Sequence, residues 1–326
     1  MSPAAPYRSG FVALVGRPNV GKSTLLNRIL GDKIAIISDK PQTTRTRILG
    51  VKHLPDAQLV FVDTPGIHKP KFRLNQRMVE TALNALAEVD LVFFLVEATE
   101  APGPGDRFVI DRLKEGRAPA FLVINKVDLV RKPRLLPLIE TYRKMHEFAE
   151  IVPISAKAGD GVERLVDLAQ ARMLEGPVYF PEDVMTDQPM RVLAAELIRE
   201  KILDKTRDEL PFAVAVGIDS FIEEEARPTG RKPVLAGSGR AGAMTPGAGG
   251  CKRGGKLARI SATVYVEKKS QKAIVIGKQG AMLKAVGTYA RIDMEHLFGM
   301  KVFLQLWVKV KEAWRQDERM LVELGY

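Results

Sequence analysis

The sequence has almost no cysteine and no long hydrophobic run. A single cysteine, Cys251, excludes an internal disulfide and any zinc site made of several thiolates, which fits a reducing compartment. The longest apolar runs, residues 91–96 and 120–124, are far shorter than the roughly 20 residues that a membrane-spanning helix needs. They predict buried strands. Residues 1–10 also lack the pattern of a secretion signal, so we expect a cytosolic protein.

Acidic residues are outnumbered by basic ones, which bears on the choice of partner. The chain has 50 Lys and Arg against 39 Asp and Glu, a net charge of +11 and a pI of about 9.6. Such a charge favours polyanions, either nucleic acid or the acidic surface of a membrane. The hydrophobic share of 46% is that of a globular protein, and 326 residues are enough for about two domains.

Short apolar runs alternate with helix-length segments in the first half of the chain. This alternation predicts an α/β domain over residues 8–176, with a mostly parallel sheet flanked by helices. Residues 47–53 are too close to the next strand for a helix to intervene, so we expect them to pair antiparallel with it. The predicted parallel strands are residues 11–15, 59–62, 91–96, 120–124 and 151–154.

The second half of the chain predicts an α+β domain. Prolines interrupt the periodicity over residues 177–189, which we interpret as a linker to a domain spanning residues 190–326. The stretch 226–256 is rich in glycine and basic residues and cannot bury a core, so we expect a mobile basic insert. The remaining predicted elements are helices at 192–204, 274–286 and 288–297 and strands at 212–222, 259–267 and 301–310.

A phosphate-binding loop follows the first predicted strand and opens into a helix. It fits the pattern Gly-x4-Gly-Lys-Ser, in which glycines let backbone N–H groups close on phosphates. Lys22 would reach the terminal phosphates, and the Ser23 hydroxyl would bind Mg²⁺. The predicted nucleotide-binding residues here are Gly16, Arg17, Pro18, Asn19, Val20, Gly21, Lys22, Ser23 and Thr24.

Two further motifs select guanine over adenine. The carboxylate of Asp128 can accept hydrogen bonds from both N1–H and the exocyclic amine of guanine, a pair of donors that adenine lacks. The residues after the next strand fit a backbone contact to the guanine oxygen. These two motifs consist of Asn125, Lys126, Val127 and Asp128, and of Ser155, Ala156 and Lys157.

A fourth motif at a strand end, Asp63-Thr64-Pro65-Gly66, completes the candidate site. Asp63 can hold Mg²⁺ through water, and the Gly66 N–H can turn toward the terminal phosphate. Taken alone, Asp63 is equally well explained as a cap of a helix or turn. Either Thr43 or Thr44 can supply another Mg²⁺ ligand, and we favour Thr44.

A Gly-x-x-Gly turn lies between helical stretches of the second domain. Such a turn lets two helix ends approach a nucleic-acid backbone beside a groove for single-stranded bases. Alone, the pattern more often connects two helices, since glycine commonly ends a helix. The order helix, strand, strand, helix, helix, strand around it is that of a type II KH domain. The candidate RNA-binding residues are Gly277, Lys278, Gln279, Gly280 and Lys284.

Together these motifs resemble the Era family of bacterial GTPases over residues 10–326, apart from the basic insert. The resemblance rests on the segments 16–23, 41–45, 63–68, 125–128 and 306–311, together with Trp314. It implies GTP hydrolysis to GDP with Mg²⁺, binding to the 3′ region of 16S ribosomal RNA, and a role in maturation of the 30S subunit. Peripheral contact with the inner membrane is compatible with the basic charge. The basic insert either grips RNA phosphates or has no function in binding.

The predicted catalytic residues are Lys22, Thr44 and Gly66. Ile67 occupies the position where Ras-type enzymes carry a water-orienting Gln, which predicts slow intrinsic hydrolysis. The resemblance also suggests that Asn19 coordinates K⁺ in place of an arginine finger; otherwise Asn19 only stabilises the loop. An alternative is an RNA-binding assembly factor in which GTP is mainly a structural ligand.

Overall fold

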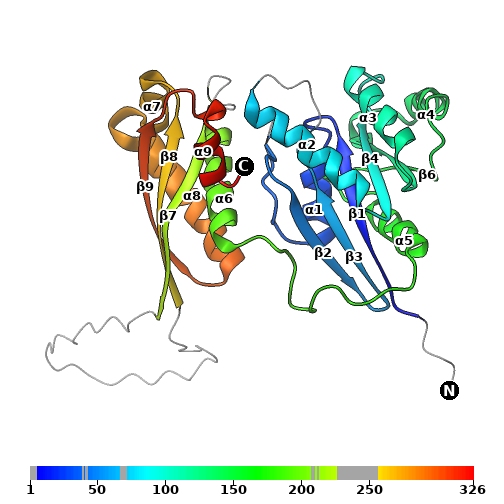
Figure 1. The fold of residues 1–326 in the computed structure, drawn as a ribbon, viewed down its shortest axis with the longest axis horizontal. Helices are drawn as coiled ribbons and strands as arrows, with labels where there is room; N and C mark the ends of the chain where they lie inside the picture. Colours follow the sequence, from blue (N-terminus) through cyan, green and yellow to red (C-terminus); the bar gives the residue numbers. More distant parts are fainter. Residues whose placement is uncertain are drawn as a thin grey trace, which may run out of the picture.

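The structure, a computed structural model, describes residues 6–38, 40, 43–66, 72–206, 210, 213–225 and 256–326. Its described strands form two sheets (Figure 1): one of six strands in the order β2-β3-β1-β4-β5-β6 and one of three in the order β7-β8-β9. The predicted fold class, a phosphate-loop α/β domain followed by an α+β domain of KH type, is confirmed.

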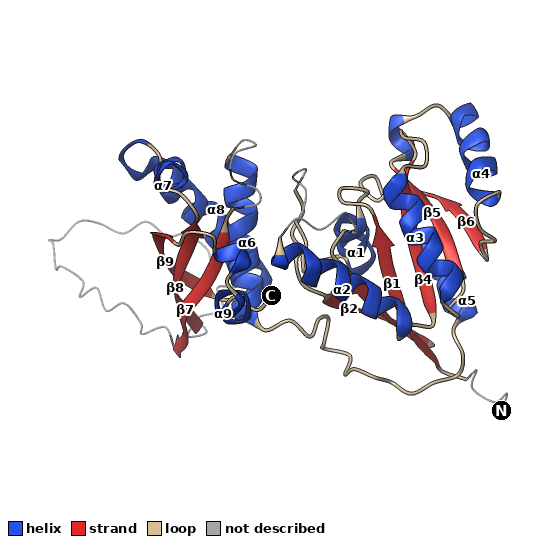
Figure 2. Ribbon diagram, turned by 45° about the horizontal axis from the view of Figure 1, so that its top comes forward, coloured by secondary structure: helices blue, strands red, loops and turns tan. Residues whose placement is uncertain are grey.

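The first sheet is parallel except for its edge strand β2 (Ile48–Leu54), which pairs antiparallel with β3 as predicted. Its central strands are continuously apolar because helices cover both faces (Figure 2). The other strands are β1 (Arg8–Gly16), β3 (Ala57–Asp63), β4 (Leu91–Glu97), β5 (Ala120–Asn125) and β6 (Glu150–Pro153).

Alternate residues of β1 divide the core between the two faces. Val12 and Leu14 pack with α1 (Lys22–Leu30) and α5 (Val162–Arg172), whereas Ala13 and Val15 pack on the opposite side. That side is covered by α2 (Arg73–Ala87), α3 (Pro104–Glu115) and α4 (Leu135–Arg143). The loops at the carboxyl ends of the strands are left open for a ligand.

The linker is pinned along the first sheet by one buried glutamine. Gln58 on β3 is fully buried; its Nε2 donates to the Phe180 carbonyl at 2.7 Å, and its Oε1 accepts from the N–H groups of Tyr179 (2.8 Å) and Phe180 (3.0 Å). The Val51 N–H also donates to the Met185 carbonyl. The chain therefore follows a defined path between the domains.

The second sheet carries three helices on one face and the short C-terminal helix on part of the other, in the predicted order of a type II KH domain. β7 (Ala215–Glu225) pairs antiparallel with β8 (Lys256–Val266), and β8 pairs parallel with β9 (Lys301–Val310). The helices are α6 (Met190–Lys205), α7 (Lys269–Ile276) and α8 (Ala281–Phe298), with a last short helix α9 (Glu318–Glu323). Insert residues 226–255 lie outside the described residues, and Lys256 begins β8.

The predicted helix boundaries near the Gly-x-x-Gly turn are wrong. The helices end and begin at residues 276 and 281, and α8 runs without a break through position 287. Positive φ angles at Gly277 (71°), Gln279 (52°) and Gly280 (78°) interrupt the helix at the turn, whereas Gly287 stays helical and faces Leu306. No helix among the residues that the structure describes is long and apolar enough to cross a membrane.

Replacing Gln58 with alanine is expected to destabilise the protein by about 1–3 kcal/mol, because the linker amides and carbonyl lose buried partners. Urea unfolding measures the change. The matched control is Gln76→Ala on the exposed face of α2, which is expected to change stability by less than about 0.5 kcal/mol. Equal stabilities of the two variants would contradict a structural role for Gln58.

Candidate nucleotide and RNA sites

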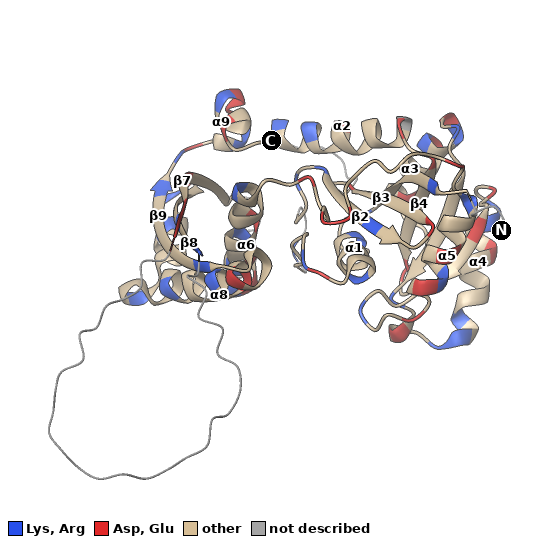
Figure 3. Cartoon of the chain, turned by 90° about the horizontal axis from the view of Figure 1, so that it is seen from below, with Lys and Arg blue, Asp and Glu red and all other residues tan. Residues whose placement is uncertain are grey.

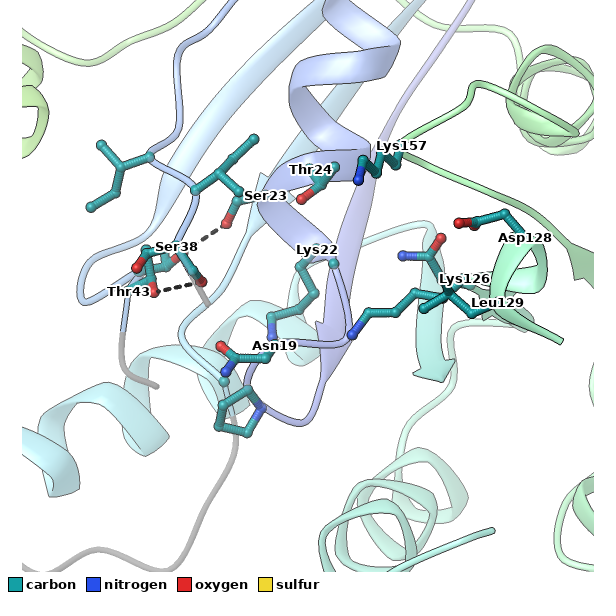
Figure 4. Close-up of a pocket in the computed structure, with 17 residues that line it drawn as sticks. Asn19, Lys22, Ser23, Thr24, Ser38, Thr43, Lys126, Asp128, Leu129 and Lys157 are labelled. Atoms are coloured by element: carbon teal, nitrogen blue, oxygen red, sulfur yellow. Dashed lines mark hydrogen bonds between the residues drawn. The ribbon is translucent and has the colours of Figure 1, made fainter. Parts of the chain in front are cut away.

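A cavity of about 640 Å³ lies at the carboxyl ends of the strands of the first sheet (Figure 4). It brings together residues from all of the predicted nucleotide motifs, although the motif at residues 63–66 contributes only Gly66 to its lining. The predicted residues that line it are Pro18, Asn19, Gly21, Lys22, Ser23, Thr24, Thr44, Gly66, Asn125, Lys126, Asp128 and Lys157. Sequence reasoning missed Ile36, Ile37, Ser38 and Leu129, which also line it and belong to no motif.

The phosphate loop requires glycine at two positions for steric reasons. A Cβ on Gly16 (φ +152°) would lie 2.4 Å from the Leu95 carbonyl oxygen, and one on Gly21 (φ +99°) would lie 2.2 Å from Asn125 Nδ2. Asn19 also has a positive φ of 65°. The loop therefore passes against β4 and β5 with its amides turned toward the cavity at the start of α1.

Lys22 is a buried cation at the base of this loop. Its Nζ donates to the carbonyl oxygens of Gly16 (3.2 Å) and Arg17 (2.9 Å). Burial lowers the pKa of the Lys22 ammonium to about 8, against the opposing attraction of Asp63. A bound polyphosphate would raise that pKa again because it supplies negative charge beside the ammonium.

Three oxygen-bearing side chains meet beside Lys22. Ser23 Oγ donates to Asp63 Oδ2 at 2.7 Å and lies 2.8 Å from Thr44 Oγ1, while Thr44 Oγ1 lies 3.4 Å from Asp63 Oδ2. Burial raises the pKa of Asp63 to about 6, opposed by Lys22 and by these hydroxyls. Hard oxygen donors of this kind suit Mg²⁺. The Thr43 hydroxyl instead donates to the carbonyls of Ser38 and Lys40, so Thr44 is the threonine that faces the cluster.

Asn125 holds the guanine motifs to the phosphate loop. Its Nδ2 donates to the Val20 carbonyl at 2.8 Å, and its Oδ1 accepts from the Ala156 N–H at 2.9 Å. Two neighbouring loops are thereby fixed around one buried amide. Asp128 is exposed and lines the cavity, so that a base in the cavity can reach its carboxylate (Figure 4).

The other predicted nucleotide residues lie behind the cavity wall. Arg17 points toward α3, where its Nε lies 3.0 Å from the buried carboxylate of Asp106 and its Nη1 lies 2.9 Å from Glu100. Only its backbone faces the loop interior. Val20 is in the core, Thr64 donates to the Leu14 carbonyl, and Ser155 Oγ accepts from the Ala158 N–H. Gly16, Pro65, Val127 and Ala156 are also absent from the lining, and Ile67 lies outside the described residues.

The Gly-x-x-Gly turn opens onto a groove of about 450 Å³ between α8 and β9. A Cβ on Gly277 would lie 2.6 Å from Met282 Cβ, so this glycine allows the turn to pack on the start of α8. Predicted residues Gly280 and Lys284 line the groove, and sequence reasoning missed Arg291 at its far end. Leu304 and Leu306 form its apolar floor, which suits unpaired bases.

The residues next to the cluster of Ser23, Asp63 and Thr44 are held by the second domain. Arg45 is buried; its Nη1 donates to the Val214 carbonyl at 2.8 Å and to the Tyr326 hydroxyl at 3.2 Å. Its guanidinium lies 5.5 Å from the ring centroids of both Trp314 and Tyr326. Burial lowers the pKa of Arg45, and the nearby Tyr326 hydroxyl opposes that effect. No sequence signal pointed to this contact.

Two more contacts join the same two regions. Arg199 on α6 donates to the Thr43 carbonyl, and Glu200 Oε1 accepts from the Ile37 N–H at 2.9 Å. On the other side of the junction, Arg77 of α2 pairs with Glu318 of α9; Figure 3 shows the start of α2 beside α9 and the C-terminus. The segment that contains Thr44 therefore lies at the junction of the two domains and is hydrogen-bonded to the second domain on both sides of Thr44.

Asp128→Asn is expected to weaken GDP binding at least tenfold, because a carbonyl and an amide replace the carboxylate that accepts two guanine donors. Titration calorimetry measures the change. Asp160→Asn, in an exposed part of the loop after β6, provides the matched control and is expected to bind GDP as the unmodified protein does. Unchanged GDP affinity in Asp128→Asn would mean that the base binds elsewhere.

Comparison with known proteins agrees with this geometry. Residues 11–126 match the family model described as 50S ribosome-binding GTPase, and residues 252–315 match that of the KH domain. The chain is 54% identical over 321 residues to GTPase Era of Geobacter metallireducens, and this alignment covers 98% of each protein. It is 49% identical over 320 residues to GTPase Era of Syntrophus aciditrophicus, and this alignment covers 98% of the chain and 95% of that protein.

A solved structure also superimposes on nearly the whole chain. It is the crystal structure of Era in complex with MgGDPNP and nucleotides 1506–1542 of 16S ribosomal RNA, with a TM-score of 0.87, 40% identity, and coverage of 98% of this chain and 99% of that one. The similarity therefore extends through both domains and the linker. This chain belongs to the Era family of GTPases.

Proposed function

We propose that this protein hydrolyses Mg·GTP to GDP and binds the 3′ region of 16S ribosomal RNA during maturation of the 30S subunit. The observation that carries the proposal is the full-length similarity to the Era structure that holds MgGDPNP and nucleotides 1506–1542 of that RNA. The cavity in the first domain and the groove in the second support it, since each has the chemistry of one of these ligands.

The residues around the cavity would have separate roles in GTP hydrolysis. Lys22 and the amides at the start of α1 would hold the β- and γ-phosphates and neutralise their charge. Ser23, Thr44 and Asp63 would hold Mg²⁺, which withdraws charge from the phosphate oxygens. Gly66 passes so close to the loop that a Cβ would lie 2.7 Å from Pro18 N, and its N–H would approach the γ-phosphate.

Slow intrinsic hydrolysis remains our prediction, because Ile67 cannot orient water as glutamine does. Activation by K⁺ through Asn19 is also a proposal, supported by the position of Asn19 in the lining of the cavity. If GTP is instead mainly a structural ligand, single-turnover hydrolysis stays slow when 30S subunits are added. A cytosolic location, with at most peripheral contact with the inner membrane, likewise remains a prediction.

The nucleotide state would reach the RNA-binding domain through Thr44 and Arg45. Thr44 would bind Mg²⁺ in the GTP-bound state, and the adjacent Arg45 lies against Trp314 and Tyr326 in the second domain. Loss of the γ-phosphate would release Thr44 and shift the segment that Arg199 also holds. Binding of GTP and of RNA is then coupled, and each changes the affinity for the other by the same factor.

Gly280→Asp is expected to reduce the affinity for an RNA of nucleotides 1506–1542 by at least tenfold, because it adds a negative charge and a strained side chain (φ +78°) at the groove. GTP hydrolysis without RNA should not change. Gly299→Asp is the matched control, since this glycine also has a positive φ of 64° and open space around it, at the other end of α8. Equal RNA affinity of the two variants would rule out the groove as the RNA site.

Arg45→Ala is expected to reduce the difference in RNA affinity between the GDPNP-bound and GDP-bound protein to less than about twofold, from a coupling of about 5- to 150-fold. Fluorescence anisotropy with labelled RNA measures both states. Arg47→Ala, two residues away and exposed, should keep the full difference. Undiminished coupling in a folded Arg45→Ala protein would show that the signal travels by another route.

A further inference from the structure

The outer face of the second sheet exposes aromatic side chains that no helix covers. On the edge strand β9, Phe303 is 47% exposed and Trp307 is 60% exposed, and both lie on the face opposite to Leu304 and Leu306. Gln305 stands between them and is also exposed. At about 3.3 Å per residue, the two rings are roughly 13 Å apart along the strand. We call Phe303, Gln305 and Trp307 the β9 platform.

Basic side chains surround this platform. Arg259 on the paired strand lies over the Phe303 ring at 5.5 Å, and Lys301 and Lys309 occupy the two ends of the same row. Carboxylates beside this row are engaged: Glu224 pairs with Arg259 at 2.9 Å, Glu295 of α8 lies 3.4 Å from Lys301, and Asp219 accepts from the Thr263 hydroxyl at 2.8 Å. The platform therefore combines aromatic faces with exposed basic side chains, of which Lys301 is 77% exposed although it lies near Glu295.

The platform is continuous with the proposed RNA groove. β9 is an edge strand of the second sheet (Figure 1), and its inward residues Leu304 and Leu306 form the floor of the groove that begins at Gly280. Only the width of one strand separates the groove from the platform. An RNA that leaves the groove at this edge would therefore have a short distance to cover to the outer face.

We propose that the β9 platform is a second RNA-binding surface, on which unpaired bases of the same RNA stack after leaving the Gly-x-x-Gly groove. Aromatic rings flanked by cations are how single-stranded nucleic acid is held without regard to sequence, and an amide between the rings can meet a base edge. This inference rests on the proposed RNA-binding function. It assigns Trp307 and Phe303 as base-stacking residues and Lys301 and Lys309 as phosphate contacts.

The test measures affinity for a synthetic RNA of nucleotides 1506–1542 of 16S ribosomal RNA. Trp307→Ala and Phe303→Ala are each expected to weaken binding by roughly 5- to 150-fold, the loss of one stacked base. Phe108→Ala is the matched control: Phe108 on α3 is 39% exposed and also carries an arginine over its ring, at 5.4 Å, but lies in the other domain. GTP binding by every variant verifies that it is folded.

Tryptophan fluorescence gives a second readout that does not depend on a truncated side chain. The sequence has two tryptophans, and Trp314 is fully buried. RNA should quench the emission of the unmodified protein and protect it from acrylamide, whereas Trp307→Phe should bind RNA with little change in emission. Quenching that persists in Trp307→Phe would contradict stacking on Trp307.

The outcomes separate this proposal from the proposed function. If the unmodified protein binds the RNA, Gly280→Asp does not, and both platform variants bind as the unmodified protein does, the platform is not an RNA surface although the groove is. If the unmodified protein itself does not bind, the proposed function fails. A concentration-dependent dimer that Trp307→Ala abolishes, with RNA affinity unchanged, would make the platform a self-association surface and overturn the proposal.

Discussion

The contact among Ser23, Asp63 and Thr44 is the constraint on which the rest of the structure depends. Within 2.7 to 3.4 Å it joins the first turn of α1, the end of β3 and the segment that leads to Arg45. Asp63 is buried, and the three oxygens are hard donors that would exchange their mutual hydrogen bonds for bonds to a divalent cation. A change in these hydrogen bonds therefore affects all three segments.

The segment that carries Thr44 continues into Arg45, which joins the two domains. Arg45 is buried; it donates to the Val214 carbonyl and the Tyr326 hydroxyl, and its guanidinium lies over the rings of Trp314 and Tyr326. One side chain of the first domain therefore contacts three residues of the second. Gln58 meanwhile holds the linker against β3.

Sequence reasoning recovered the parts of the fold and site that are encoded locally. The phosphate loop, the strand-end position of Asp63 and the antiparallel β2 follow from spacing and from the steric needs of Gly16 and Gly21. The choice of Thr44 over Thr43 agrees with where their hydroxyls point. The error at the helices of the second domain arose because helical periodicity continues across Gly277, where only the backbone φ shows the break.

Long-range partners could not be predicted from one sequence. Nothing near Arg45 indicates that Trp314 and Tyr326 lie over it, since they come from the far end of the chain. Arg17 fits the loop pattern, yet its side chain pairs with Asp106 because α3 places a buried carboxylate behind the loop. The exposure of Trp307 likewise depends on which face of β9 the helices cover.

The central claim is that this cavity recognises a guanine nucleotide with its phosphates and Mg²⁺. Calorimetric titration of the unmodified protein with Mg·GTP and with Mg·ATP tests it most directly. The account predicts that GTP binds and that ATP binds at least about 10³-fold more weakly, because adenine leaves the Asp128 carboxylate without its paired donors. Equal or tighter binding of ATP would contradict it.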